Sequence, residues 1–326
     1  MIRKIGLLFS VLTLILLTSC GTIKSENSEP DKSDFIALVT GITGNQGGGV
    51  AGTLLERGYH VRGMTRDTGS ESAQNWANLG AEMVYGDFTY HDSIESALKD
   101  ADFLFINLQE QVPNYIDETK FLLDAAKRAG VKHIMYSSNR RSEPELPQSA
   151  SKTEIERYLR ASGSSYTTVR IPQMMSNFVR ERDMANVLRN GVTGRGTEGA
   201  TFAYFAPDDL GLLAAAAIED MDGWNGREVN LSGEEISDKD LAELLSELSG
   251  LEIKYTPAPA QPEARWIANQ GLSYDTTVLR AEFPSIMTLR EYLIKNDYGA
   301  KLKEMSTKPL PEVEPRVRPG NNPNPR

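Results

Sequence analysis

The chain has 326 residues, which is enough for one large domain or two modest ones with a sizeable buried core. Hydrophobic residues make up 40% of it and charged residues 25%, and this ordinary globular usage excludes fibrous and disordered proteins. The chain carries 45 acidic against 35 basic residues, a formal net charge of -10, so we expect no nucleic-acid partner. One cysteine cannot form an intramolecular disulfide, and three histidines spread along the sequence predict no metal site.

The N-terminal segment has the organisation of an export signal. Arg3 and Lys4 precede an apolar run that is shorter than the stretch of about 20 residues needed to span a bilayer. The sequence LTSC at 17–20 ends this run and resembles the lipobox of bacterial lipoproteins, in which the cysteine carries diacylglycerol. The resemblance implies a signal peptide over 1–19 and a lipid on Cys20. The protein would then be anchored in the bacterial cell envelope, at the outer membrane or the outer cell surface. An ordinary signal peptide and a buried N-terminal helix are the alternatives.

Two segments without apolar patterning flank the expected fold. Residues 20–34 carry almost no apolar side chains and are expected to form a flexible tether. Repeated prolines from 308 to 326 exclude helix and interior strand there, so we expect a disordered tail. The folded domain is therefore expected over 35–307.

Short apolar strands alternate with amphipathic helices in the first half of that domain. The almost continuously apolar run at 35–40 reads as a buried strand, and a helix follows it until Gly58. The alternation continues with strands at 60–64, 82–85, 103–106, 133–136 and 166–170, and with helices at 72–79, 93–98, 115–129 and 151–161. This order predicts an α/β fold with a Rossmann-type, doubly wound parallel sheet.

The second half of the domain is less regular. We expect a strand at 201–205, a helix at 208–219, a strand at 227–231 and a helix that begins at the N-cap Ser237. The predicted core therefore covers 35–172. A small α+β lobe over 173–307 would close over the carboxyl ends of the strands, where such sheets bind ligands.

The turn after the first strand carries the spacing G-x-x-G-x-x-G. The first glycine would permit a tight turn, the second the approach of a pyrophosphate, and the third close packing of the helix on the strand. Because the triplet follows a buried strand and opens a helix, it predicts dinucleotide binding rather than only a flexible turn. The candidate residues in this loop are Gly41, Thr43, Gly44, Asn45, Gln46 and Gly47.

Residues after the second and third strands should select the cofactor. Arg66 would accommodate the 2′-phosphate of NADP(H), with Arg62 as a helper, whereas Asp67 would hold the ribose 2′-hydroxyl of NAD(H). We expect NADP(H) to be preferred, with NAD(H) as the alternative. Asp87 and Phe88 are expected near the adenine, although Asp87 could equally cap the next helix.

Further motifs extend along the domain, as VTGITGNQGGGV (39–50), RGMTRD (62–67), YGDF (85–88), VKHIMYSS (131–138), SKTEIERYLRASGSSYTTVRIPQMMSNF (151–178) and AYFAPDDLG (203–211). Together they resemble the NmrA-like branch of the atypical short-chain dehydrogenase/reductases. The resemblance implies a Rossmann-type sheet, a nicotinamide dinucleotide site and a small C-terminal substrate lobe. Members include NADPH-dependent quinone and isoflavonoid-type reductases, and also regulators that bind the dinucleotide without catalysis.

The sequence departs from the Tyr-x-x-x-Lys pattern of that superfamily. Lys152 occupies the lysine position, but Gln148 stands where the tyrosine would be and cannot act as acid or base. This disfavours tyrosine-based carbonyl reduction but leaves direct hydride transfer to a quinone open. The match of Lys152 to the lysine of the family pattern implies that it acts as a catalytic acid or binds the ribose hydroxyls. The alternative is that Lys152 is an exposed lysine on a helix.

Other strand ends are expected to line the nicotinamide and the substrate. The expected cofactor contacts there are Asn107, Leu108, Ser138 and Pro172, and the expected substrate contacts are Gln109, Met174 and Phe178. The sequence supports two functions. One is a membrane-tethered NAD(P)H-dependent oxidoreductase that acts on a quinone-like or other small electrophilic substrate. The other is a non-catalytic dinucleotide-binding sensor or interaction protein.

Overall fold

The computed structural model describes residues 32–109, 112–139, 150–195, 200–257 and 276–311. The predicted signal peptide, Cys20 and Gln148 lie outside the described residues, as do most of the predicted tether and tail. The last residues of the predicted tether form the short 3-10 helix η1 (Lys32–Asp34), and the Lys32 ammonium lies 3.4 Å from the carboxylate of Glu219. This end of the segment is therefore part of the fold.

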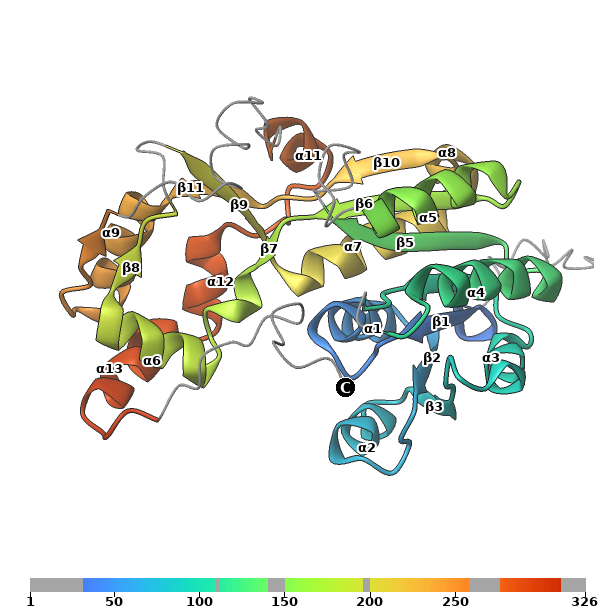
Figure 1. Cartoon of the computed structure of the whole chain (residues 1–326), viewed down its shortest axis with the longest axis horizontal. Helices are drawn as coiled ribbons and strands as arrows, with labels where there is room; N and C mark the ends of the chain where they lie inside the picture. The colour runs from blue at the N-terminus through green and yellow to red at the C-terminus, as the bar shows by residue number, and fades with distance from the viewer. Residues whose placement is uncertain (1–31, 110–111, 140–149, 196–199, 258–275, 312–326) are drawn as a thin grey trace, which may run out of the picture. The chain divides into compact units, whose positions relative to one another are not determined.

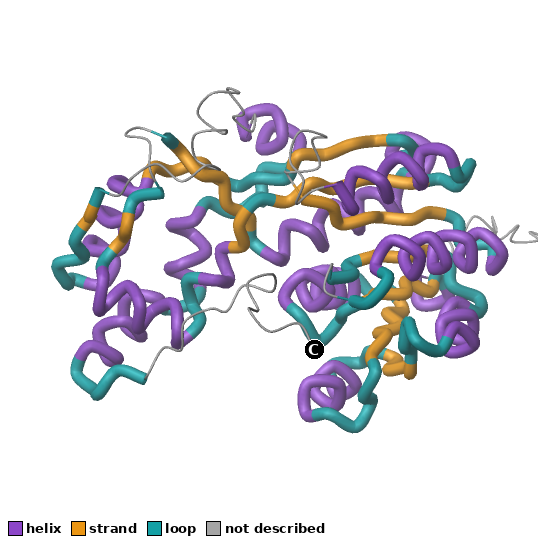
Figure 2. Tube along the Cα trace, in the orientation of Figure 1, coloured by secondary structure: helices purple, strands orange, loops and turns teal. Residues whose placement is uncertain are grey.

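A seven-stranded parallel sheet forms the centre of the fold (Figures 1 and 2), as the sequence predicts. Its strand order is β10-β6-β5-β4-β1-β2-β3, so the chain reverses direction across the sheet between β1 and β4. Ligands bind α/β sheets at such a reversal, outside the carboxyl ends of the strands. The strands are β1 (Ile36–Thr40), β2 (His60–Thr65), β3 (Glu82–Tyr85), β4 (Phe103–Ile106), β5 (His133–Asn139), β6 (Tyr166–Ile171) and β10 (Arg227–Asn230).

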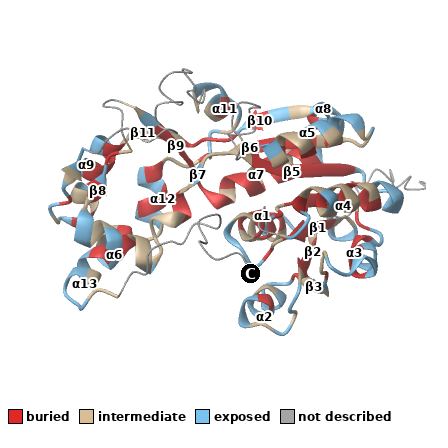
Figure 3. Cartoon of the chain, viewed as in Figure 1, coloured by how far each residue is buried: buried red, intermediate tan, exposed pale blue. Residues whose placement is uncertain are grey.

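Helices pack on both faces of this sheet, because successive strand residues point to opposite faces. Phe103 and Phe105 of β4 belong to one apolar cluster, and Leu104 and Ile106 belong to another. The central strands β1, β4 and β5 are accordingly buried from both sides (Figure 3), whereas the edge strand β3 has no buried residue. The helices of this part are α1 (Asn45–Glu56), α2 (Glu71–Asn78), α3 (His91–Leu98), α4 (Tyr115–Ala129), α5 (Ala150–Ala161), α7 (Pro207–Glu219) and α8 (Met221–Trp224).

The structure corrects the predicted boundary at residue 172. The elements predicted at 208–219 and 227–231 exist, but α7 and β10 belong to the core rather than to the lobe. β10 extends the parallel sheet beside β6, and α7 packs against α1. A Cβ atom on Gly49 would lie 2.2 Å from the carbonyl oxygen of Pro207, and one on Gly211 would lie 2.3 Å from the Thr53 hydroxyl oxygen. Glycine at these two positions lets the helices approach closely.

The C-terminal lobe is built from most of the remaining elements around its own apolar cluster. It holds a three-stranded sheet, β11-β9-β7, and a short pair, β12-β8. As predicted, the hydroxyl of Ser237 caps α9 by accepting a hydrogen bond from the backbone N–H of Asp240 at 3.1 Å. The elements are β7 (Gln173–Met174), η3 (Met175–Asn177), α6 (Glu181–Asn190), β8 (Val192–Thr193), β9 (Thr201–Phe205), β11 (Glu234–Ser237), α9 (Asp238–Ser249), β12 (Tyr255–Thr256), α12 (Leu289–Lys295) and α13 (Tyr298–Ser306). The helix α11 (Thr276–Glu282) packs on the core instead, where its Leu279 belongs to the same apolar cluster as Phe103.

A buried carboxylate ties this lobe to the core. Asp209 on α7 is fully buried and accepts hydrogen bonds from the backbone N–H groups of Ala206 at 3.1 Å and Met287 at 3.3 Å. Burial raises the pKa of Asp209 to about 7, although both N–H groups favour the ionised form. One side chain thus fixes the start of α7 and the segment that leads into α12.

Candidate functional site

The glycine loop forms a tight turn between β1 and α1. Gly41 has a φ of +65°, in the left-handed region that favours glycine, and the N–H of Gly44 donates to its carbonyl oxygen at 2.9 Å. A Cβ atom on Gly47 would lie 2.4 Å from that same oxygen, so no other residue fits there. Gly44 is the N-cap of α1 and offers no side-chain acceptor, so the first amides of α1 are open to an anion.

A cleft of about 500 Å³ lies beside this loop at the carboxyl ends of β1 to β4. Each of these four strands contributes residues from its end, which is the arrangement expected for a ligand site of a Rossmann-type sheet. The structure therefore brings together most of the residues that the sequence predicts to bind a dinucleotide. The lining residues are Thr40, Gly41, Thr43, Gly44, Met64, Thr65, Arg66, Gly86, Asp87, Phe88, Thr89, Asn107, Leu108, Gln109, Val112 and Pro113.

Arg66 and Asp87 carry the charge of this cleft. The Asp87 carboxylate accepts hydrogen bonds from the backbone N–H and the hydroxyl of Thr89, both at 2.8 Å. These two bonds and the nearby positive charge of Arg66 hold the pKa of Asp87 below its usual range. Asp87 does not cap the next helix, because α3 begins at His91 and has Tyr90 as its N-cap. That alternative is therefore wrong.

The two other charged residues considered for cofactor choice lie outside the cleft lining. The Asp67 carboxylate accepts from the backbone N–H of Gly69 at 2.9 Å and shapes the turn before α2. Arg62 is paired across the sheet with Glu82 of β3, at 2.8 Å, and also donates to the carbonyl oxygen of Ala97 at 3.1 Å. The prediction that Arg62 assists Arg66 is wrong, because these contacts hold its guanidinium between β3 and the end of α3.

Lys152 is buried rather than exposed, so the exposed-lysine alternative is wrong. Its ammonium donates to the carbonyl oxygen of Leu108 at 3.3 Å and to that of Ser137 at 3.2 Å. It also lies over the rings of Tyr115 and Tyr136, whose hydroxyl oxygens are 2.7 Å apart. Lys152 thus joins the ends of β4 and β5 behind Leu108, a residue of the cleft lining.

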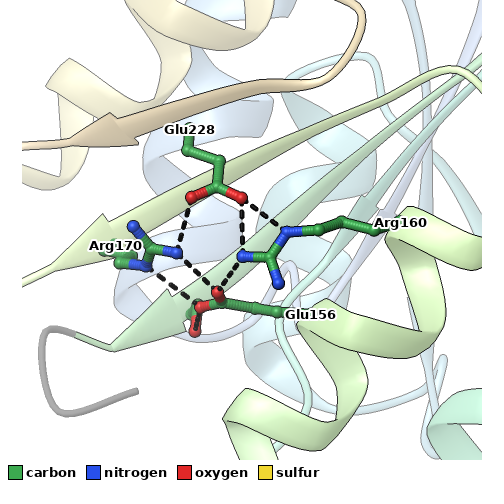
Figure 4. Close-up of polar contacts among 5 residues, drawn as sticks. Glu156, Arg160, Arg170 and Glu228 are labelled. Carbon is green, nitrogen blue, oxygen red and sulfur yellow. Dashed lines mark hydrogen bonds and ion pairs between the residues drawn. The ribbon is translucent and has the colours of Figure 1, made fainter. Parts of the chain in front are cut away.

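Ser138 is absent from the cleft lining and bonds to a network of ion pairs that Figure 4 shows. Its hydroxyl donates to the Glu156 carboxylate at 2.6 Å, and Glu156 lies 2.6 Å from the Arg170 guanidinium. Arg160 and Glu228 complete the network. The predicted contact of Ser138 with a cofactor stays a prediction, and the bond to Glu156 uses the hydroxyl hydrogen of Ser138. Its neighbour Ser137 donates to the Gln46 amide oxygen at 2.7 Å and ties β5 to α1.

A comparison with known protein families identifies the chain. The NmrA-like family model matches residues 33–282, which is most of the sequence. The chain belongs to the NmrA-like family.

Two curated fungal relatives show how far this likeness extends. The NmrA-like family domain-containing oxidoreductase malD of Malbranchea aurantiaca is 30% identical over 258 residues, which are 69% of this chain and 76% of that protein. The NmrA-like family domain-containing oxidoreductase lnaB of Aspergillus flavus is 30% identical over 201 residues, 56% of each protein. This chain thus spans about half the length of the second relative.

Solved structures share the fold. Triphenylmethane reductase of Citrobacter sp., complexed with NADP(H), has a TM-score of 0.65 at 23% identity and is covered over 99% of its length by 80% of this chain. NmrA, a negative transcriptional regulator in complex with NAD, has a TM-score of 0.69 at 18% identity, covering 85% of this chain and 99% of that one. The chain therefore has the NAD(P)-binding Rossmann fold, shared by a reductase and a regulator.

The remaining predicted site residues of this NmrA-like protein do not lie in one site. Gln109 lines the dinucleotide cleft, whereas Phe178 lines a second cavity in the lobe. Met174 is partly buried and packs against the core, and Pro172 connects β6 to β7. Asn45 is exposed at the start of α1.

The second cavity was not predicted from the sequence. It has a volume of about 590 Å³ and lies between η3, α6, β8, β9 and α9. Its charged lining residues come from three separate segments, and no local motif marks them. They are Arg180, Arg182, Asp183, Arg195 and Asp238.

The described residues form neither a metal-binding cluster nor a membrane-spanning helix. Among the described residues, no group of three or more histidine, cysteine, aspartate or glutamate side chains could hold a metal ion. Within the same ranges, the helices are too short or too polar to cross a membrane.

Proposed function

We propose that this NmrA-like protein is an NADPH-dependent oxidoreductase that transfers hydride directly to a quinone-like or other small electrophilic substrate. The observation that carries the proposal is the cleft that joins the glycine loop to Arg66 at the strand ends. The names of the curated relatives, which are oxidoreductases, support the same activity class. Besides the cofactor, the protein would bind a small-molecule substrate.

The residues of the cleft fit a dinucleotide. The open amides at the start of α1, next to Gly44, suit a pyrophosphate, because the helix N-terminus carries a partial positive charge. Arg66 lies where it can pair with a 2′-phosphate, and Phe88 and Asp87 flank the same end. Asn107 follows β4 on the side that would receive the nicotinamide.

NADPH, when bound, would supply a hydride with both electrons to the quinone, and one proton from the solvent would complete the hydroquinone, leaving NADP⁺. No tyrosine acid is required for this chemistry. Within the chain, Lys152 acts as a positioning residue, because it holds the carbonyl groups of Leu108 and Ser137 at two adjacent strand ends. The NADP(H) complex of triphenylmethane reductase supports reduction on this fold.

Thermal unfolding of the full chain with NADPH or NADH tests cofactor binding. A ligand that binds only the native state adds about 2.7 kcal/mol of stability at 100 times its Kd. We expect a larger rise in Tm with NADPH than with NADH, followed by NADPH oxidation when 1,4-naphthoquinone is added. No Tm shift with either dinucleotide would overturn the proposal.

A non-catalytic sensor is the second candidate, favoured by the structural likeness to the regulator NmrA. A sensor would show the Tm shift without turnover of any quinone. Lys152→Ala distinguishes the two further, since an oxidoreductase would lose turnover whereas a sensor would lose only dinucleotide affinity.

We also propose that the protein is a lipoprotein of the bacterial cell envelope, anchored through Cys20. The support is the lipobox-like sequence at 17–20 after a short apolar run. Mass spectrometry of the N-terminal peptide should find a diacylglyceryl group on Cys20, and Cys20→Ser should release the protein from the membrane fraction. An unmodified N-terminal Met1 in the membrane-bound protein would contradict this proposal.

A further inference from the structure

The cavity in the C-terminal lobe has an excess of positive charge. Its lining contains three arginines, Arg180, Arg182 and Arg195, against two carboxylates, Asp183 and Asp238. The elements that surround it, among them α6, β8 and α9, lie together in Figure 1. A net positive charge in a cavity favours ligands that carry a negative charge.

Each carboxylate of the lining is held mainly by one arginine. Asp238 accepts from the backbone N–H and the guanidinium of Arg195, which also donates to the Tyr204 hydroxyl. Asp183 lies 2.7 Å from Nε of Arg180. Arg182 reaches Asp183 only at 3.4 Å, a weak contact, so the guanidinium of Arg182 provides the surplus charge.

Aromatic and amide side chains complete the wall. The rings of Phe178 and Tyr204 lie 5.3 Å apart at an angle of 51°. Gln173 and Asn177 bring carboxamide groups to the same lining. Rings suit a flat conjugated molecule, and guanidinium and amide groups suit its anionic substituent, since planar guanidinium pairs well with carboxylate and related oxyanions.

This cavity begins at the edge of the sheet that holds the dinucleotide cleft. Gln173 lies two residues after β6 ends at Ile171, and β6 runs parallel to β5, β4 and β1. The carboxyl ends of all these strands share one edge. Gln173 therefore brings one wall residue of the cavity to the edge of the sheet at which the dinucleotide cleft lies.

We propose that the cavity is the substrate pocket and that it selects flat electrophiles bearing an anionic group, such as a carboxylate or sulfonate. Arg182 is the residue that determines this selectivity. The inference rests on the proposed oxidoreductase function and adds the charge class of its substrate. It also predicts that cationic triphenylmethane dyes are poor substrates of this protein.

Steady-state oxidation of NADPH by the full chain tests the proposal with two probes, 1,4-naphthoquinone and 1,4-naphthoquinone-2-sulfonate. Arg182→Gln should raise KM for the sulfonate about tenfold, the loss for one charge-assisted hydrogen bond, and leave KM for the neutral quinone unchanged. Arg157→Gln is the matched control, because Arg157 is exposed on α5, away from the cavity. It should change neither value.

The outcomes distinguish a failure of the charge selectivity from a failure of the oxidoreductase function. If Arg182→Gln affects both quinones equally, or neither, the charge selectivity is refuted although the oxidoreductase function stands. If no quinone is reduced, the proposed function fails. The selectivity is then read from the rise in Tm that naphthalene-2-sulfonate causes: a rise that Arg182→Gln abolishes supports the anion pocket, and an unchanged or absent rise refutes it. Arg182→Glu should reverse the preference and admit a cationic dye.

Discussion

The dinucleotide cleft and the arginine-lined cavity of the lobe are built in different ways. The cleft is formed by residues at the ends of four adjacent strands, and it adjoins a glycine loop in which Gly47 leaves no room for a Cβ atom. The cavity is formed by long side chains from segments that the sequence separates, such as Arg182 and Arg195. The backbone amides of the glycine loop would bind the constant pyrophosphate of the proposed cofactor, whereas a site made of side chains can be changed residue by residue.

The largest effect is expected when one methyl group is added to the glycine loop of the cleft. Gly47→Ala would place a Cβ atom 2.4 Å from the Gly41 carbonyl oxygen. We expect a loss of about 3 kcal/mol in the free energy of unfolding and no dinucleotide binding. Calorimetry of unfolding and of NADPH binding would measure both.

Gly52→Ala is the matched control in the same helix. A Cβ atom there meets only the Trp76 ring, at 3.8 Å, which is ordinary contact. Because alanine is a better helix former than glycine, this variant should be more stable by up to about 1 kcal/mol. Equal effects of the two substitutions would show that the loop tolerates side chains.

Acid should weaken the sheet through His133. This residue is fully buried in β5 between the hydroxyl groups of Ser165 and Thr167, and burial lowers its pKa from 6.5 to about 4. The unfolded chain therefore binds the proton more readily. The stability contributed by neutral His133 is complete above pH 6.5 and is lost as the pH falls through 6.5 to 4, by about 3 kcal/mol in total.

Urea unfolding at about pH 7 and pH 4 would measure this change for the wild type and for His133→Gln. The difference between the two proteins should shrink at the lower pH, because only the wild type carries the titrating ring. A difference that is the same at both pH values would contradict the assignment.

Arg66→Gln should separate the two cofactors without affecting the fold. If Arg66 pairs with the 2′-phosphate, the variant binds NADPH about tenfold more weakly while its Kd for NADH is unchanged. Isothermal titration with both dinucleotides measures this, with Arg157→Gln as the charge control. Equal loss of both affinities would assign Arg66 to a group that the two cofactors share.

The smallest expected effect lies in the lobe. Ser237→Ala removes the hydroxyl that accepts from the Asp240 N–H at the start of α9, at a cost of about 1 kcal/mol. The dinucleotide cleft contains no residue of α9, so the Kd for NADPH should not change. A coupled loss of NADPH affinity would show that the lobe and the cleft act as one unit.

Part of the candidate site could be predicted from the sequence because its residues directly follow predicted strands. The glycine spacing after an apolar strand, and Arg66 after the next strand, follow from the order of elements alone. Arg62 could not be assigned in this way, because its partner Glu82 is set by the register between β2 and β3. The same limit applies to Ser138, whose side chain meets Glu156 of α5.

The boundary between the core and the lobe also needed the tertiary structure. The sequence predicts a helix at 208–219 and a strand at 227–231, but pairing with β6 and packing on α1 place both in the core. Gly49 of α1 and Gly211 of α7 allow that close packing. The sequence alone does not reveal this role, because it does not show that these two helices contact each other.

The sequence by itself determined the parallel sheet, the glycine loop and the family resemblance, because periodicity, turn chemistry and short motifs act between neighbouring residues. Only the tertiary structure decided that Lys152 is buried between two strand ends and that Arg182 shares a cavity with Arg195. Such contacts join segments far apart in the chain. Their geometry depends on strand order and helix packing, which no local pattern encodes.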